Sequence, residues 1–389
     1  MSSAPASIRT TEAARPAPER ASAGRWRRAP RLRTRGIGLV ELMVGMTIGL
    51  IALLVMVQTF SASQGQKANA VSGADATTAG HIALSLLERD LRNAGSGLSF
   101  VTCSEIRVYN SASSPSVTNI SALPVTIEQN TGSNTPSALQ SRSDRITIRY
   151  TQSAEGAATS TISDDMPNPS ANLRGSTSIG FTDGDLILVH EPGKPCVVLQ
   201  LTRTPNAIGG GRWNFQHNPG STGTYNPSGA PEGFFPEDGY AIGTAKILSL
   251  GSGVNEYRYQ LQFRDSNTSV PNADLAVTQV LNGTAGSPSA LARDVIALRA
   301  QYGWWNSAGT AVSFSSTIPT GALPEQLAAV RVGVVVRAGQ VDRGYTAPET
   351  ISLFAGDNPI TITLGASERN YRYRTFETVV PLRNTLWNR

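Results

Sequence analysis

The stretch that decides the fold is residues 37–57, IGLVELMVGMTIGLIALLVMV, an apolar run whose single charged residue is Glu41. A helix needs roughly 20 predominantly apolar residues to cross the hydrocarbon core of a bilayer. The run is long enough, and we predict one membrane-spanning helix there. No second run of this kind occurs in the sequence, which excludes a polytopic membrane protein.

The segment in front of this run, residues 1–36, is rich in Ala, Pro, Ser and Arg and has no apolar periodicity. It holds nine Arg against Glu12 and Glu19, a net charge of +7, so the rest of the chain carries −2 of the total charge of +5. Such a segment buries too little apolar surface to fold, and we expect an unstructured basic leader. Positive residues before an apolar span stay in the cytoplasm, so the part after Val57 is expected outside the inner membrane. Its negative net charge does not support nucleic-acid binding.

The composition of the chain as a whole is that of a globular protein. Hydrophobic residues make up 40% and charged residues only 16% of the 389 residues, with 37 Gly and 23 Pro. These values exclude a fully disordered chain and a long coiled coil. They indicate many strands joined by long polar loops, in one large or two ordinary domains.

Three interpretations of the N-terminus compete. A secretory signal peptide would be cut near residues 61–63, but its apolar core would exceed the usual length of roughly 7 to 15 residues. A plain membrane anchor does not explain Glu41, because a carboxylate in lipid costs about 2.5 to 3.5 kcal/mol, unless its side chain reaches the headgroups. The third interpretation is a prepilin-type signal that is cut in front of the apolar run.

The sequence Arg35-Gly36-Ile37-Gly38-Leu39-Val40-Glu41-Leu42, followed by the unbroken apolar run, resembles the class III signal of type IV prepilins. The resemblance implies that prepilin peptidase cuts after Gly36 and that the new N-terminus, Ile37, is methylated. It also makes Glu41 the fifth mature residue, with a role in assembly. Ile37 departs from the Phe or Met that is usual at this position, and the leader is longer than most.

The carboxylate of Glu41 can pair with a buried positive charge after cleavage. Cleavage leaves an ammonium group on Ile37 and a carboxylate on Glu41 in a low-dielectric environment, where each needs an opposite charge. In a helical bundle, Glu41 of an incoming subunit can pair with the amine of its neighbour and fix the axial register. Gly45 and Gly49, four residues apart, would let such helices approach closely. The alternative for the two glycines is ordinary membrane-helix composition.

The helical pattern continues after Val57 as an amphipathic stretch that we expect to end at Gly95 or Gly97. The opposite face offers charged residues at Lys67, Asp75, Glu88, Arg89 and Arg92. The stripe predicted to be buried consists of Ala68, Val71, Ile82, Leu86, Leu87 and Leu91.

The part after this helix shows strand patterns separated by polar tracts. The predicted strands are residues 100–109, 144–151, 185–191, 196–203, 254–264 and 328–337. The tracts assigned to loops are residues 110–143, 152–180, 204–240 and 265–290. We expect an α+β fold in which a long N-terminal helix, membrane-spanning in its first half, packs on an antiparallel β-sheet head, as in pilins. The predicted organisation is a leader (1–36), a transmembrane helix (37–57), an amphipathic helix (58–97) and a β-rich extracytoplasmic head (98–389).

Four blocks narrow the resemblance to the PilW kind of type IV pilus minor pilin. They are LSLLERDLRNAG (84–95), VIALRAQYG (295–303), VRVGVVVR (330–337) and YRTFETVVPLRN (373–384). The resemblance implies a minor pilin that helps to initiate pilus assembly and is incorporated in low copy at a tip complex. The implied partners are the major pilin and other minor pilins, prepilin peptidase, the inner-membrane assembly platform and a tip adhesin. No cofactor is implied.

Two alternatives stay open. The minor pseudopilins of type II secretion systems share the N-terminus and a similar helix end, so a secretion role is the nearest alternative. A membrane-anchored periplasmic enzyme or binding protein is the alternative from another class, and processing at Gly36 separates it from the first two.

The sequence offers little support for catalysis or metal binding. Its only histidines are His81, His190 and His217, and His81 falls within the predicted helix, so a three-ligand metal site is not expected. Residues 209–211 (GGG) lack the strand-to-helix context of a phosphate-binding loop and are predicted to form a turn. Residues 183–185 (DGD) lack the fuller ligand spacing of a calcium loop and are also predicted to form a turn.

A Gly-, Pro- and Asn-rich region holds several aromatic residues that suit either a partner surface or a small core under a long loop. We favour the core, because buried aromatic residues anchor long loops. These residues are Trp213, Phe215, Tyr225, Phe234, Phe235 and Tyr240.

Cys103 and Cys196 are the only two cysteines. An even number in an oxidising compartment favours pairing, and both lie in or beside predicted strands. We therefore predict a disulfide between them, against the alternative of two buried free thiols.

Overall fold

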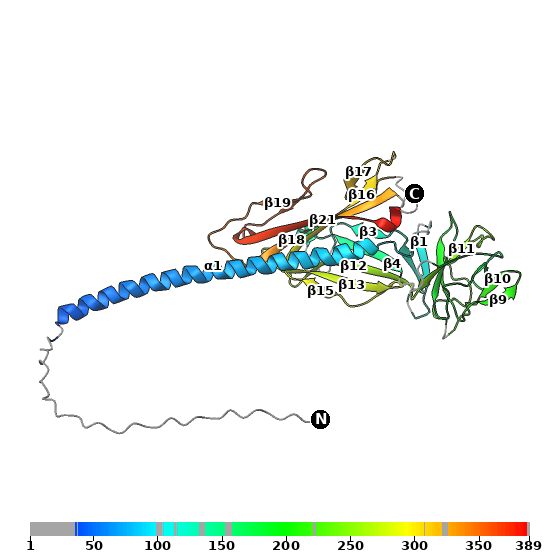
Figure 1. Cartoon of the computed structure of the whole chain (residues 1–389), viewed down its shortest axis with the longest axis horizontal. Coiled ribbons are helices and arrows are strands. Elements are labelled where there is room, and N and C mark those ends of the chain that lie inside the picture. The colour runs from blue at the N-terminus through cyan, green and yellow to red at the C-terminus, as the bar shows by residue number, and fades with distance from the viewer. Residues whose placement is uncertain are drawn as a thin grey trace, which may run out of the picture. The chain divides into compact units, whose positions relative to one another are not determined.

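The computed structural model describes residues 36, 38–98, 103, 105–112, 114, 116–131, 137–151, 158–220, 223–306, 308–320 and 326–386. The protein has an α+β fold that is mostly β, with one long N-terminal helix and many antiparallel strands (Figure 1). It divides into two compact units, Met1–Ala62 and Ser63–Arg389. The predicted basic leader, apart from Gly36, lies outside the described residues.

The helix α1 covers Leu39–Asn93, in agreement with the predicted long helix. It begins with a hydrogen bond from the Leu42 amide to the Gly38 carbonyl oxygen (3.1 Å), and the sequence over its length contains no Pro. It ends because the chain turns at Gly95 and Gly97, which adopt φ values of +76° and +73°. Glycine reaches this left-handed region at no steric cost.

The buried stripe of α1 differs from the predicted one. Leu87 and Leu91 are buried as expected, but Ala68, Val71 and Ile82 are exposed and Leu86 is only half-buried. The error has a physical cause: we assigned burial by side-chain size, whereas the sheets select the smallest residues, which let the helix backbone come close. The residues that are buried are Ser72, Ala76, Gly80, Ala83, Leu87, Asp90 and Leu91.

The buried stripe of α1 packs against two large sheets. The sheet around β12 contains, in order, β14 (Thr284–Ala285), β13 (Ala273–Leu281), β12 (Val254–Phe263), β4 (Arg145–Thr151) and β3 (Val125–Glu128), with β15 (Ser289–Ala292) also paired to β13. The sheet around β18 contains β17 (Val312–Ser315), β16 (Val295–Trp305), β18 (Leu327–Val341) and β21 (Tyr371–Pro381). Every pair in both sheets is antiparallel.

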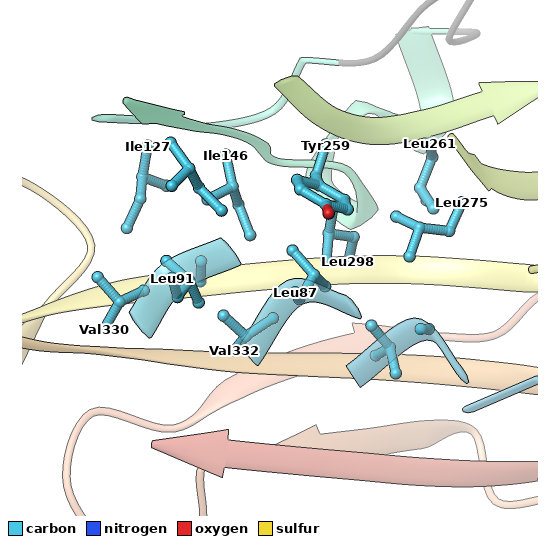
Figure 2. Close-up of a cluster of buried hydrophobic side chains, with 14 of the residues drawn as sticks. Leu87, Leu91, Ile127, Ile146, Tyr259, Leu261, Leu275, Leu298, Val330 and Val332 are labelled. Atoms are coloured by element: carbon cyan, nitrogen blue, oxygen red, sulfur yellow. The ribbon is translucent and has the colours of Figure 1, made fainter. Parts of the chain in front are cut away.

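The main hydrophobic core lies between α1 and these two sheets. Figure 2 shows Leu87 and Leu91 of the helix among side chains of both sheets, including Ile146, Tyr259 and Val332. All five are essentially inaccessible to solvent. The opposite face of the β18 sheet is covered by the hairpin of β19 (Thr350–Leu353) and β20 (Ile360–Thr363), which explains why β18 is buried on both faces along most of its length.

A third sheet holds the remaining core. Its order is β2 (Val117–Ser121), β1 (Glu105–Tyr109), β8 (Cys196–Gln200), β7 (Leu186–His190), β11 (Lys246–Gly251) and β5 (Thr159–Thr161). The β1–β8 pair is parallel, so the expectation of a purely antiparallel head is corrected at this pair. A small sheet of β6 (Leu173–Gly175), β10 (Arg212–Phe215) and β9 (Asn206–Gly209) and short helices at Ser137–Arg142, Glu368–Asn370 and Arg383–Leu386 (α2) complete the described elements.

The disulfide between Cys103 and Cys196 is present, with a Cα–Cα distance of 5.8 Å. Cys196 begins β8 and pairs with Ile106 of β1, so the bond fastens the parallel pair close to the start of both strands. In the chain-entropy model, a loop of 93 residues closed in this way stabilises the folded state by about 4 to 5 kcal/mol.

The predicted strands are confirmed by β1, β4, β7, β8, β12 and β18, within a few residues at each end. The polar tracts are corrected, because each of them contains strands in addition to loops. The largest omission is β13, which lies in the tract 265–290 and pairs with β12 over nine residues. Polar residues on both sides of its sequence, ADLAVTQVL, give the tract as a whole the composition of a loop.

Gly80 and Gly73 provide a test of the close helix packing. A methyl group at Gly80 would overlap the ring of Phe376 on β21, whereas Gly73 has open space around it. We expect Gly80→Ala to lower the free energy of unfolding by about 1 to 3 kcal/mol, because the ring must move. Gly73→Ala should be neutral or stabilising by up to about 1 kcal/mol, because Ala favours the helix. Chemical denaturation of the full chain in detergent measures both, and equal effects would contradict the close packing.

Candidate functional site

The strongest candidate site is the apolar segment of α1 within the first unit. The large side chains from Leu39 to Phe60 are all at least half exposed, on every side of the helix. An apolar surface of this extent is unfavourable in water, so this part of the helix is a site that lipid or other protein covers. By length and composition, α1 is the one helix of the described residues that qualifies as a membrane span.

The polar features of this segment are concentrated at its beginning. Glu41 lies in the first turn of α1 and is the only charged residue from Gly36 to Phe60. A carboxylate is favoured near a helix N-terminus, because the free backbone amides there carry partial positive charge. Gly36 is described and exposed, whereas Ile37, the predicted methylation site, lies outside the described residues.

Gly45 and Gly49 lie one turn apart on α1, and no atom lies within 4 Å of the position that a side chain would take at either one. They therefore form an uncovered flat strip on the helix. Such a strip allows a second helix to approach closely.

The aromatic region belongs to a core and does not form an exposed surface. Phe215, Phe234 and Tyr240 are almost completely buried in one cluster on the β7 sheet, and Trp213 and Phe235 pack against that cluster. The Tyr240 hydroxyl donates a hydrogen bond to the Pro195 carbonyl oxygen (2.6 Å), which satisfies its polar end. Tyr225 packs on the neighbouring cluster. The favoured interpretation of these residues is confirmed.

The three histidines do not gather into a site. His81 is exposed on α1 beside the ring of Phe376, and His190 and His217 are buried in the second unit. The ring nitrogens of His217 lie 2.9 Å and 3.0 Å from the carbonyl oxygens of Phe215 and Pro169. Among the described residues, no group of three or more His, Cys, Asp or Glu side chains is arranged to hold a metal ion.

The two short motifs considered for ligand binding are turns. Gly209, Gly210 and Gly211 all have positive φ angles and connect β9 to β10. Asp185 accepts hydrogen bonds from the Thr182 amide (2.8 Å) and hydroxyl (2.9 Å), which closes a turn in front of β7. Both predicted turns are confirmed.

Asp90 is a buried charged residue that our sequence reasoning assigned no role. Its carboxylate accepts hydrogen bonds from the Tyr259 hydroxyl on β12 (2.6 Å) and from Nε of Arg89 (2.9 Å). Burial and the bond to Asp90 raise the pKa of Tyr259. The sequence signal for a buried Asp90 is its position, because it lies three residues after Leu87 and next to Leu91, on the face of the helix that is buried. This contact fixes the rotation of α1 on the β12 sheet.

His190 gives a prediction on pH dependence. Burial, with a smaller contribution from Lys246, lowers the pKa of His190 from 6.5 to about 4. In the unfolded chain this histidine takes up a proton near pH 6.5, whereas in the folded chain it does so only near pH 4. The stability contributed by neutral His190 is complete above pH 6.5 and is lost as the pH falls towards 4. We expect a loss of about 3 kcal/mol over this interval.

The measurement is the thermal unfolding midpoint of the full chain between pH 7 and pH 4, for the wild type and for His190→Leu. The variant should lose less stability on acidification than the wild type. His81→Leu is the matched control, because it makes the same replacement at an exposed position on α1. Parallel curves for the wild type and His190→Leu would refute the assignment.

Comparison with known proteins identifies one family. Residues 259–384 match the family model of PilW, described as Type IV Pilus-assembly protein W. This region runs from β12 to α2 and includes the whole β18 sheet. No match was found among curated proteins or among solved structures. The match covers about a third of the chain and supports a PilW-type protein, associated with the type IV pilus.

Proposed function

We propose that the chain is a minor pilin that helps to initiate type IV pilus assembly and is incorporated in low copy in a tip complex. The observation that carries the proposal is the apolar helix surface from Leu39 to Phe60, uncovered on all sides and interrupted by one charge at Glu41. The PilW match at the other end of the chain supports the same conclusion independently. A head of this size would crowd its neighbours if every subunit of a thin fibre carried one, which favours a low-copy position.

The proposed route begins in the inner membrane, with the apolar segment in the bilayer and the second unit in the periplasm. Prepilin peptidase cuts after Gly36 and the amine of Ile37 is methylated. The assembly platform then transfers the helix from lipid into the bundle of the growing fibre. The apolar surface stays out of water throughout, because neighbouring helices replace the lipid.

Glu41 acts at the transfer step. Inside the bundle, its carboxylate pairs with the N-terminal ammonium group of a neighbouring subunit, and this buried pair sets how far the incoming helix advances. The Gly45–Gly49 strip lets the two helices lie close enough for the pair to form. The partners are the major pilin and the other minor pilins, and a tip adhesin is a further candidate for contact with the head. After assembly, the protein lies at the cell surface.

Deletion of the gene tests the assembly role directly. We expect surface pili to be lost or strongly reduced while protein secretion continues, because an initiating subunit is needed before the major pilin polymerises. Counting sheared pili and assaying secreted enzymes in the same strain measures both. Loss of secretion with normal pili would assign the protein to a type II secretion system, and no change in either would favour a membrane-anchored periplasmic enzyme or binding protein.

Substitutions at Gly36 and Glu41 separate processing from assembly. Gly36→Ala should block cleavage, so that the leader remains and Ile37 is not exposed. Glu41→Ala should be cleaved normally but incorporated about a hundredfold less, because an unpaired buried charge costs about 3 to 5 kcal/mol. Glu41→Gln keeps the shape but not the charge and should rescue incompletely.

The readouts are N-terminal sequencing of the membrane-extracted chain and the fraction of processed protein that co-purifies with sheared pili. Thr47→Val is the matched control on the same helix, because the Thr47 hydroxyl donates its hydrogen bond to the Val44 carbonyl oxygen one turn away, within α1 itself. Equal recovery of the wild type, Glu41→Ala and Glu41→Gln would show that the carboxylate is not needed for register.

A further inference from the structure

We propose that the free edge of β21 is a docking site for an extended strand of another pilus subunit, which carries an acidic side chain opposite Arg374. The identity of the partner as a pilus subunit rests on the proposed function. The docking itself rests on the geometry of the β18 sheet, in which β21 is the outer strand and pairs only with β18.

The length of β21 is the first observation. It has 11 residues, whereas no other outer strand of the described sheets exceeds five. Natural proteins keep exposed edge strands short, because a long row of unpaired backbone groups recruits other chains. A single long edge in a fold whose other edges are short therefore marks a surface that is used for pairing.

The direction of the backbone groups is the second observation. Pro381 is opposite Ala329, and the neighbouring Leu382 amide bonds to the Ala328 carbonyl oxygen (2.9 Å). Opposite residues in an antiparallel pair alternate between bonded and non-bonded positions. The even-numbered residues 374–380 therefore bond to β18, and the odd-numbered residues 373–379 direct their amide and carbonyl groups away from the sheet.

The free groups are open to solvent. Thr375, Glu377 and Val379 are exposed, and among the described residues no hydrogen bond outside the β18 ladder reaches their backbone groups, although the Glu377 carboxylate accepts one from the Phe354 amide (3.0 Å). Val379 is 54% exposed despite its apolar side chain. Pro381, which lacks an amide hydrogen, occupies the next outward position and ends the usable edge at no cost to the β18 ladder.

The other end of the edge is closed by local structure. The chain that follows β18 lies against this end, where the Ala347 amide bonds to the Arg369 carbonyl oxygen (2.7 Å), two residues before β21 begins. The open edge thus extends over residues 373–379, which at about 3.3 Å per residue suits one ordinary strand of a partner.

Charge identifies the kind of partner. Arg372 on β21 is paired with Asp342 (2.9 Å), whereas exposed Arg374 has no ion pair among the described residues. The β21 edge of a second copy cannot supply one in an antiparallel pair. In an antiparallel β21–β21 pair, the odd-numbered residues, whose backbone groups point outward, would lie opposite odd-numbered residues of the other copy. Arg374 would therefore lie opposite an even-numbered residue in every register, and never opposite Glu377. The even-numbered residues of β21 include no acid. A different chain with Asp or Glu at the facing position fits best.

The test uses the direction of the amide groups. Thr375→Pro removes an outward amide hydrogen and should leave the β18 ladder intact, whereas Thr375→Ala keeps that hydrogen. In cells with the complete pilus machinery, we expect Thr375→Pro to reduce surface pili about tenfold or more, and Thr375→Ala to match the wild type. Thr378→Pro is the matched inward control and should destabilise the head, seen as loss of protease resistance.

A photo-cross-linking side chain, benzoylphenylalanine, placed at Val379 identifies the occupant without changing the edge backbone. We expect an adduct with another pilin-type subunit, mapped to an extended segment that contains Asp or Glu. Arg374→Glu should weaken this adduct, and reversing the facing acid to Arg in the partner should restore it. An adduct with a second copy of the chain, or no adduct from folded protein, would overturn the proposal.

The outcomes are distinguishable from failure of the proposed function. If the minor-pilin role is wrong, Gly36→Ala and deletion will leave pili unchanged. If only the edge proposal is wrong, those two changes will abolish pili while Thr375→Pro, with normal protein level and an intact disulfide, assembles like the wild type.

Discussion

The close approach of α1 to the two large sheets is the packing interaction on which the rest of the head depends. Gly80 keeps the helix surface low where it meets Phe376 of β21, and Leu87 and Leu91 fill the space between the β12 and β18 sheets. Because one helix face contacts both sheets, it determines the distance between them. The hydrogen bond between Asp90 and Tyr259 fixes the rotation of the helix, since it ties one position of the stripe to β12.

Buried ion pairs connect parts of the head that are distant in sequence. Arg142 pairs with Glu368 (2.6 Å), Arg149 with Glu256 (2.5 Å), and Arg299 with Asp144 (3.2 Å); all six side chains are nearly inaccessible to solvent. Such pairs gain little net stability, because desolvation offsets their attraction, but losing one partner is costly. Burial raises the pKa of Asp144, and Arg299 opposes that shift. These pairs favour one arrangement of the loops over alternatives.

The sequence contained the local features of the fold but not the pairing between distant segments. The apolar run from Ile37 and the Val-rich stretch of β18 were recognisable because their patterns are strong and local. The buried stripe of α1 was misjudged at Val71 and Ile82, since which helix face is covered depends on sheets far along the chain. The two cysteines could be paired by number alone. The β21 edge could not be foreseen, because it depends on strand order, which no local pattern reveals.

Assembly at the N-terminal helix and recognition at the head solve different problems. A pairing between Glu41 and a neighbour's amine would fix how far a subunit advances along the fibre, but any subunit with the same N-terminal pattern would satisfy it equally. Discrimination between partners requires contacts that differ from one subunit to another. A strand edge supplies them, since backbone hydrogen bonds give affinity to any extended segment while alternate side chains accept or reject its sequence. The unpaired charge of Arg374 on this edge would make that selection depend on one complementary acid.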